Sequence, residues 1–163
     1  MASGVAISDE VITHFEKIRV RLQGSEEKER LKLVIMRLSE DQKNIIVDHQ
    51  ASLKVKDVCD EDDVFKKVVS MLPAKDCRYA LYDCSYATKE SVKEDLVFIM
   101  WAPEDAPIKT KMVYASSKGA LRTKLPGLKF EWQVNDPADK EKCALVEKLG
   151  GPSLVKSLEG KPL

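Results

Sequence analysis

The sequence has little of what membrane proteins and secreted proteins need. No stretch approaches the roughly 20 consecutive apolar residues of a membrane-spanning helix. The first ten residues, MASGVAISDE, lack the basic start and apolar run of a secretory signal peptide. We therefore expect a cytoplasmic protein.

Cysteine is scarce and is spaced too widely for a redox or chelating pair. No CxxC motif occurs, and a reducing compartment favours free thiols over a disulfide framework. Cys77 and Cys84 are seven residues apart on one predicted strand, so their side chains should point to opposite faces of a sheet. We expect unligated thiols at all four cysteines, which are Cys59, Cys77, Cys84 and Cys143.

Motifs of catalysis are also missing. A nucleophile elbow, a phosphate loop, a dinucleotide fingerprint and a zinc-protease helix each need glycines or histidines at fixed offsets, and none of these patterns is present. The two histidines, His14 and His49, are predicted at the surface rather than as ligands. The acidic run Asp57–Asp63 is typical of a solvated loop and helix start. We expect no enzyme activity, no cofactor and no metal.

The chain as a whole has no excess of charge of either sign, but one segment has. The 27 basic residues balance 27 acidic ones, which argues against a general nucleic-acid binder. The segment Ile108–Phe130 nevertheless has no acid and six cations, which are Lys109, Lys111, Lys118, Arg122, Lys124 and Lys129. A rigid helix with such a face can attract an acidic partner.

The hydrophobic spacing predicts one domain over residues 1–163, of α/β (α+β) type, with helices on both faces of a central mixed sheet of five to six strands. The predicted helices are Asp9–Leu22, Val64–Leu72, the basic segment and Pro137–Leu149. The predicted strands are Leu31–Leu38, Asn44–Asp48, Cys77–Tyr86, Leu96–Trp101 and Leu128–Val134. The polar stretch Ala87–Asp95 is predicted as an exposed loop, and Ser153–Leu158 as an apolar tail segment.

The basic helix has two apolar sides. One strip holds Ile108, Met112, Ala115 and Gly119, and a second, about 120° or more away, holds Tyr114, Leu121 and Leu125. A helix buried on both sides would explain this pattern. The alternative is that the Met112 strip faces a partner, because Lys111, Lys118 and Arg122 border it like the charged rim of an interface. That partner should be acidic and should offer an apolar cleft.

Several blocks in fixed order resemble the cofilin and actin-depolymerising-factor family. They are DCRYALYD (Asp76–Asp83), DLVFIMWAPE (Asp95–Glu104), KMVYASSK (Lys111–Lys118), EKLGG (Glu147–Gly151), and MASGV and LEGKPL at the two ends. The similarity spans essentially the whole chain. It implies an actin-depolymerising-factor homology domain, mostly monomeric, that binds monomeric and filamentous actin and severs or depolymerises filaments.

The resemblance also implies site residues. The expected actin contacts are Ser3, Gly4, Lys109, Lys111, Met112, Ser117, Arg122 and Lys124. A second surface for the side of filaments would use Lys89, Lys93, Asp95, Glu147 and Lys148. Ser3 matches a serine that LIM-type kinases phosphorylate and a phosphatase restores, and a phosphate there would repel an acidic partner. Phosphoinositide head groups are expected to bind at Trp101, Lys109 and Lys111.

The chain departs from the family pattern at three places. Val92 stands where relatives usually carry a second cation beside Lys93, so filament side binding is expected to be weaker or altered. SEEKERLK replaces a basic import cluster, which argues against nuclear entry. Phe130 replaces a histidine linked to pH dependence. Two rival functions are a glia-maturation-factor type that binds the actin-related branching complex, and a peripheral lipid-binding adaptor.

Overall fold

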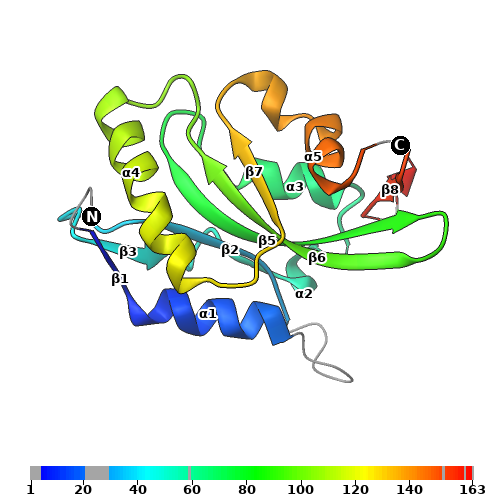
Figure 1. Ribbon diagram of the computed structural model, residues 1–163, viewed down its shortest axis with the longest axis horizontal. Coiled ribbons are helices and arrows are strands. Elements are labelled where there is room, and N and C mark those ends of the chain that lie inside the picture. Colours follow the sequence, from blue (N-terminus) through cyan, green and yellow to red (C-terminus); the bar gives the residue numbers. More distant parts are fainter. Residues whose placement is uncertain (1–4, 21–29, 59, 152, 160, 163) are drawn as a thin grey trace.

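A central sheet lies between two layers of helices in the computed structural model, which describes residues 5–20, 30–58, 60–151, 153–159 and 161–162 (Figure 1). The main strands are β1 (Ala6–Ile7), β2 (Leu31–Leu38), β3 (Asn44–Val47), β5 (Arg78–Thr88), β6 (Val92–Trp101) and β7 (Phe130–Val134). They are ordered β1-β3-β2-β5-β6-β7. The short strands are β4 (Leu53–Lys54) beside β2, β8 (Val155–Leu158) beside β5 and β9 (Lys161–Pro162) beside β8.

The sheet is mixed, as predicted. The pairs β1 with β3 and β6 with β7 are parallel, and the other pairs are antiparallel. The expected count of five to six strands matches the six of the main path but not the whole sheet, which has nine among the described residues. Off the main path, β4 and β9 have two residues each, too few for a periodic signal in the sequence, and β8 has four.

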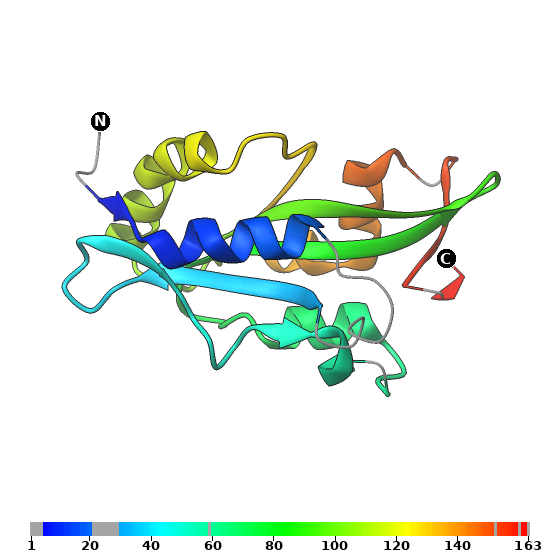
Figure 2. The same cartoon turned by 90° about the horizontal axis from the view of Figure 1, so that it is seen from below.

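Each face of the sheet carries its own helices (Figure 2). The helices α1 (Asp9–Val20) and α4 (Ile108–Lys124) cover one face, and α2 (Val55–Val58), α3 (Val64–Ser70) and α5 (Lys142–Leu149) cover the other. Because strand side chains alternate, neighbouring residues of β6 enter different cores: Phe98 packs toward α1 and α4, and Ile99 toward α3 and α5. The continuous apolar run of β6 therefore reflects burial on both faces.

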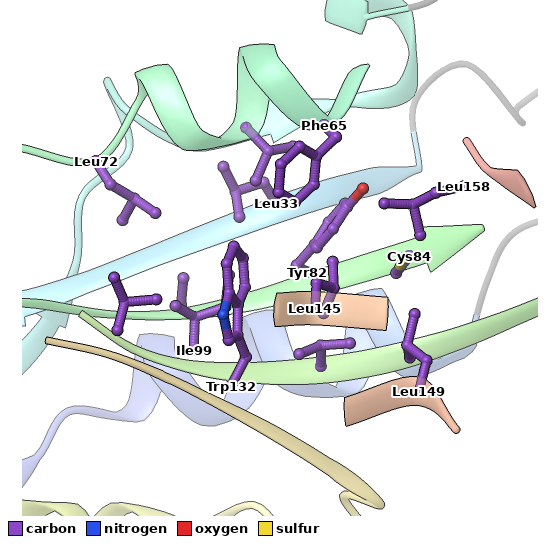
Figure 3. Close-up of a cluster of buried hydrophobic side chains, with 14 of the residues drawn as sticks. Leu33, Phe65, Leu72, Tyr82, Cys84, Ile99, Trp132, Leu145, Leu149 and Leu158 are labelled. Atoms are coloured by element: carbon purple, nitrogen blue, oxygen red, sulfur yellow. The ribbon is translucent and has the colours of Figure 1, made fainter. Parts of the chain in front are cut away.

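The core under α3 and α5 is built around aromatic rings (Figure 3). Phe65 of α3 stacks on Trp132 of β7, with ring centroids 5.7 Å apart. The indole nitrogens find backbone acceptors: Trp132 donates to Asp139 O at 2.8 Å and Trp101 to Pro73 O at 2.5 Å. These bonds tie the loop between α3 and β5, and the turn before α5, to the sheet.

Two predicted elements are wrong in extent. Ala87–Asp95 is not a loop: β5 continues to Thr88 and β6 begins at Val92, so a long two-stranded ribbon projects from the sheet. The partner strand β8, which the sequence suggested only as a tail segment, pairs with Tyr86–Thr88 and supports this extension. The helix predicted from Pro137 is interrupted: a 3-10 turn, η2 (Pro137–Lys140), precedes α5. The Asp139 carboxylate accepts hydrogen bonds from the backbone N–H groups of Asn135 and Asp136, just before this turn.

The cysteines behave as the spacing predicted. Cys77 and Cys84 lie in different cores on opposite faces of the sheet, and both are free thiols, as is the exposed Cys143. Burial raises the pKa of Cys77 to about 11, which keeps its thiol protonated and unreactive. Cys59 lies outside the described residues.

A buried ion pair fastens the C-terminal segment to the sheet. Lys32 Nζ of β2 lies 2.9 Å from Glu159 Oε1, and both side chains are almost fully buried. The same oxygen accepts hydrogen bonds from the Tyr82 hydroxyl at 2.6 Å and the Ser85 N–H at 3.0 Å. A carboxylate satisfied by three donors is favourable inside a protein, but either partner alone would not be.

We expect Glu159→Gln to destabilise the fold strongly, because it leaves the Lys32 ammonium buried without its counter-charge. The cost should be about 3 kcal/mol, which lowers the melting temperature by roughly 6–12 °C for a chain of this size. Thermal unfolding followed by circular dichroism measures this. Glu90→Gln, at the exposed turn of the β5–β6 ribbon, is the control. Equal melting temperatures for the two variants would contradict the proposed role of the pair.

Candidate functional site

The helix α4 is anchored to the sheet along its inner side. The Tyr114 hydroxyl accepts a hydrogen bond from Leu38 N–H at 2.9 Å, and the Tyr79 hydroxyl donates to Tyr114 O. Leu121 and Leu125 are buried in the same core. The helix ends before Pro126, which cannot continue it. These contacts fix which side of α4 faces outward.

The outer side of α4 is an exposed apolar strip. Ile108 is 73 % exposed and Met112 66 % exposed, and Ala115 and Gly119 are exposed further along the helix. The prediction that the Met112 strip is open and that the Tyr114 side faces the sheet is confirmed. Large apolar side chains this exposed are unusual on a folded domain and mark a contact surface when they gather beside charges.

The first turn of α4 also runs against the rules of helix stability. It has no acidic residue, its N-cap Pro107 makes no side-chain capping bond, and Lys109 and Lys111 place positive charge at the positive end of the helix dipole. Lys109 is exposed, and Lys111 Nζ lies 3.2 Å from Glu104 O. Neither lysine makes an ion pair with a described residue. Departures from local stability of this kind are expected at functional sites.

Two cations in the second half of α4, unlike those of the first turn, make ion pairs with a described residue. Lys118 Nζ lies 2.6 Å from Glu131 Oε2, and Arg122 pairs with the other oxygen of the same carboxylate. The Arg122 guanidinium also lies 5.3 Å from the centre of the Phe98 ring. Lys118 and Arg122, predicted to border the Met112 strip, are each about 30 % exposed and already paired with Glu131 of β7. Lys124, in the last turn, is exposed.

Two residues expected to contact a ligand are buried. Ser117 is 0 % exposed on the inner side of α4, so its side chain cannot touch a partner docked on the outer strip. Trp101 is 1 % exposed and its indole is bonded to Pro73 O, so it cannot meet a phosphoinositide head group directly. Ser117 faces the sheet from α4, whereas Trp101 of β6 points into the core on the other face of the sheet. Lys109 and Met112 remain as exposed members of that set in the first turns of α4, and Lys111 is half-buried.

The N-terminal contacts, Ser3 and Gly4, lie outside the described residues. The segment that follows them is described: β1 pairs with β3 through Ala6 and Ile7 and contacts α4. The chain therefore enters the fold beside the basic helix.

The second expected surface is at the far end of the molecule. Lys89 and Lys93 are exposed on the β5–β6 ribbon, and Asp95 is half-buried with its carboxylate accepting from the Tyr86 hydroxyl at 2.6 Å. By strand alternation Lys93 and Asp95 share the face of the sheet that α5 covers, where Glu147 and Lys148 are exposed.

Val92, the departure noted in the sequence, is 72 % exposed at the start of β6. Both views place this ribbon tip at the opposite end of the sheet from α4 (Figures 1 and 2).

The sequence missed one polar cluster near β3. The rings of His14 and His49 meet edge to face with centroids 5.2 Å apart, and His49 Nε2 lies 3.0 Å from Glu10 Oε2. The hydrogen bond with His49, and then that from Val47 N–H, hold the pKa of Glu10 below its ordinary value. The sequence places Glu10 and His14 four residues apart on α1, but the approach of His49 depends on tertiary structure.

Two kinds of feature are absent from the described residues. They hold no group of three or more histidines, cysteines or carboxylates arranged to bind a metal ion. None of their helices is long and apolar enough to span a lipid bilayer.

Comparison with known proteins gives a family match and several structural likenesses. Residues 4–150 match the family model described as cofilin/tropomyosin-type actin-binding protein. A Streptomyces griseoflavus cofilin is similar in structure, with a TM-score of 0.73, 28 % identity, and coverage of 90 % of this chain and 98 % of that one. The ADF-like UNC-60A protein of Caenorhabditis elegans is similar with a TM-score of 0.67 and 29 % identity, over 92 % of this chain and 96 % of that one.

A more distant likeness is to a glia maturation factor from Caenorhabditis elegans, with a TM-score of 0.62 and 17 % identity over 91 % of this chain and 99 % of that one. At this identity the likeness shows the shared fold alone.

Proposed function

Because the chain belongs to the family of cofilin/tropomyosin-type actin-binding proteins, we propose that it binds monomeric and filamentous actin and severs and depolymerises filaments. The observation that carries the proposal is the first half of α4, where an exposed apolar strip lies beside two lysines without ion-pair partners among the described residues. This combination suits a partner with an apolar cleft and an acidic border.

The apolar strip supplies the affinity at this first surface. Ile108 and Met112 lose most of their contact with water on docking, and the flexible methionine adapts to the shape of the cleft. Lys109 and Lys111, aided by the positive end of the helix dipole, raise the rate of encounter with an acidic surface. Binding requires no chemistry from this chain.

The ribbon at the other end of the sheet is the proposed second surface. With Lys89, Lys93 and Asp95 there, and Glu147 and Lys148 on α5, one molecule docked by α4 on one actin would reach the neighbouring subunit of a filament. A protein that binds one filament geometry better than another shifts the filament toward that geometry. The boundary between bare and decorated segments would then be the place where the filament breaks.

Regulation is proposed at the same first surface. A phosphate on Ser3, added by a LIM-type kinase and removed by a phosphatase, brings about −1.5 to −2 charges to the segment that leads into β1 beside α4. Phosphoinositide head groups would compete with actin for Lys109 and Lys111. We propose the actin cytoskeleton of the cytoplasm as the place where the protein meets these partners.

The double reversal Lys109→Glu/Lys111→Glu should abolish cosedimentation with actin filaments and binding to monomers. The same change should leave the melting temperature equal or raise it by about 2 °C, because acids in the first helical turn are favourable. An unchanged or higher melting temperature would show that the loss of binding is not caused by unfolding. Lys66→Glu/Lys67→Glu, at the start of α3 on the opposite face of the sheet, is the matched control and should bind normally. Binding by the α4 variant at the wild-type level would refute the proposed surface.

Filaments labelled for fluorescence microscopy should break along their sides when the protein is added. Val92→Lys should increase the frequency of breaks, because it adds a cation beside Lys93 at the ribbon tip. Val92→Thr keeps the branched shape without charge and is the control. Intact filaments, together with measurable monomer binding, would exclude severing and leave a monomer-directed actin binder. Removal of filament branches without severing would favour the glia-maturation-factor type of function.

A further inference from the structure

Glu131 is the acidic residue that faces the basic helix from the sheet. It lies on β7 with its Cα paired to that of Phe98 on β6, which places its side chain on the face that α4 covers. Its two oxygens bind two different cations of α4, Lys118 at 2.6 Å and Arg122. Arg122 is held on a second side by the Phe98 ring. All three charged side chains are about 70 % buried, so solvent screens their interaction only in part.

We propose that Glu131 sets the specificity of α4 by holding Lys118 and Arg122 against the sheet, which keeps these two cations from anionic membrane surfaces. The inference deepens the proposed function, since it sets the limit of the surface offered to actin. It assigns this limit to a residue that makes no contact with the outer strip itself.

A protein cleft and a membrane surface differ in how their affinity depends on the number and placement of cations. A cleft with an acidic border needs a few cations next to an apolar strip, and Lys109, Lys111 and Met112 provide them within a little more than one turn. The affinity for an anionic membrane surface increases with every cation that reaches it, whatever the arrangement of the cations. With Lys118 and Arg122 free, two further cations would join Lys109, Lys111 and the exposed Lys124 on the helix, as on a membrane-binding helix.

The geometry also explains why one carboxylate is enough. The spacing of four residues between Lys118 and Arg122 puts both on the same side of α4, above β7. Each cation takes one oxygen, so neither side chain is free to extend outward without losing its partner. The group keeps a net charge of one, but that charge is held against the sheet.

The test is binding to vesicles of phosphatidylcholine with about one third phosphatidylserine at low salt, with actin absent. Glu131→Gln should bind these vesicles on the order of fivefold more tightly than the wild type, because one net charge and two side chains are released near the surface. Glu141→Gln makes the same change in net charge at an exposed position before α5, on the other face of the sheet, and should bind as the wild type does. Equal binding by the two variants would overturn the inference, since net charge alone would then explain it.

Glu131→Asp is the second variant, for which net charge and fold are conserved. Its carboxylate is one methylene shorter and cannot reach both cations, so vesicle binding should rise to a level between those of the wild type and Glu131→Gln. Wild-type vesicle binding by Glu131→Asp would contradict a role for the pairing geometry. Because actin is absent, a failure of actin binding by the wild-type protein would leave this result unaffected.

Discussion

The strand β5 is the constraint on which the rest of the structure depends. It pairs with β2 on one side and with β6 on the other, and its end pairs with β8. Its side chains alternate between two cores, Tyr79 and Leu81 toward α1 and α4, and Ala80 and Tyr82 toward α3 and α5. A strand buried on both faces must have helices on both. The side of α4 that faces the sheet is therefore the side whose apolar residues cover the apolar side chains of this face.

The position of the proposed actin-binding surface follows from that constraint. Once Tyr114 and Leu121 occupy the core, the Met112 strip can only point outward. The first turn of α4 then bears a local cost: two lysines at the wrong end of a helix dipole and no capping side chain. The buried contacts of the inner side offset it. A site that is unfavourable by itself is stable because it shares a helix with part of the core.

Much of this arrangement could be predicted from the sequence, because the apolar period of a single segment was enough to identify an element. The central strands, α1, α3 and α4 have clear apolar periods, and the two sides of α4 could be separated by counting residues. Ser117 shows where this fails: it stands among actin-family residues in the sequence, but its place on the inner side buries it completely. The prediction for the β5–β6 ribbon also failed, because its polar residues form strands only through pairing with each other and with β8.

The least predictable features are contacts between residues far apart in the chain. The pairing of Lys118 and Arg122 with Glu131 requires the parallel register of β6 and β7, which no sequence period reveals. The same holds for Lys32 with Glu159, which are 127 residues apart. These contacts decide which charges are open to a partner, so a list of cations in the sequence overstates the basic surface of the folded protein.

The central claim is that the first turns of α4 are the surface that meets actin. Methyl NMR on the protein, alone and with added monomeric actin, tests it most directly. Ile108 and Met112 report on the outer strip of α4, and Met71, after α3, reports on the opposite face of the sheet. The account predicts that the methyl signals of Ile108 and Met112 shift or broaden while that of Met71 is unchanged. A change at Met71 with Ile108 and Met112 unaffected would contradict it.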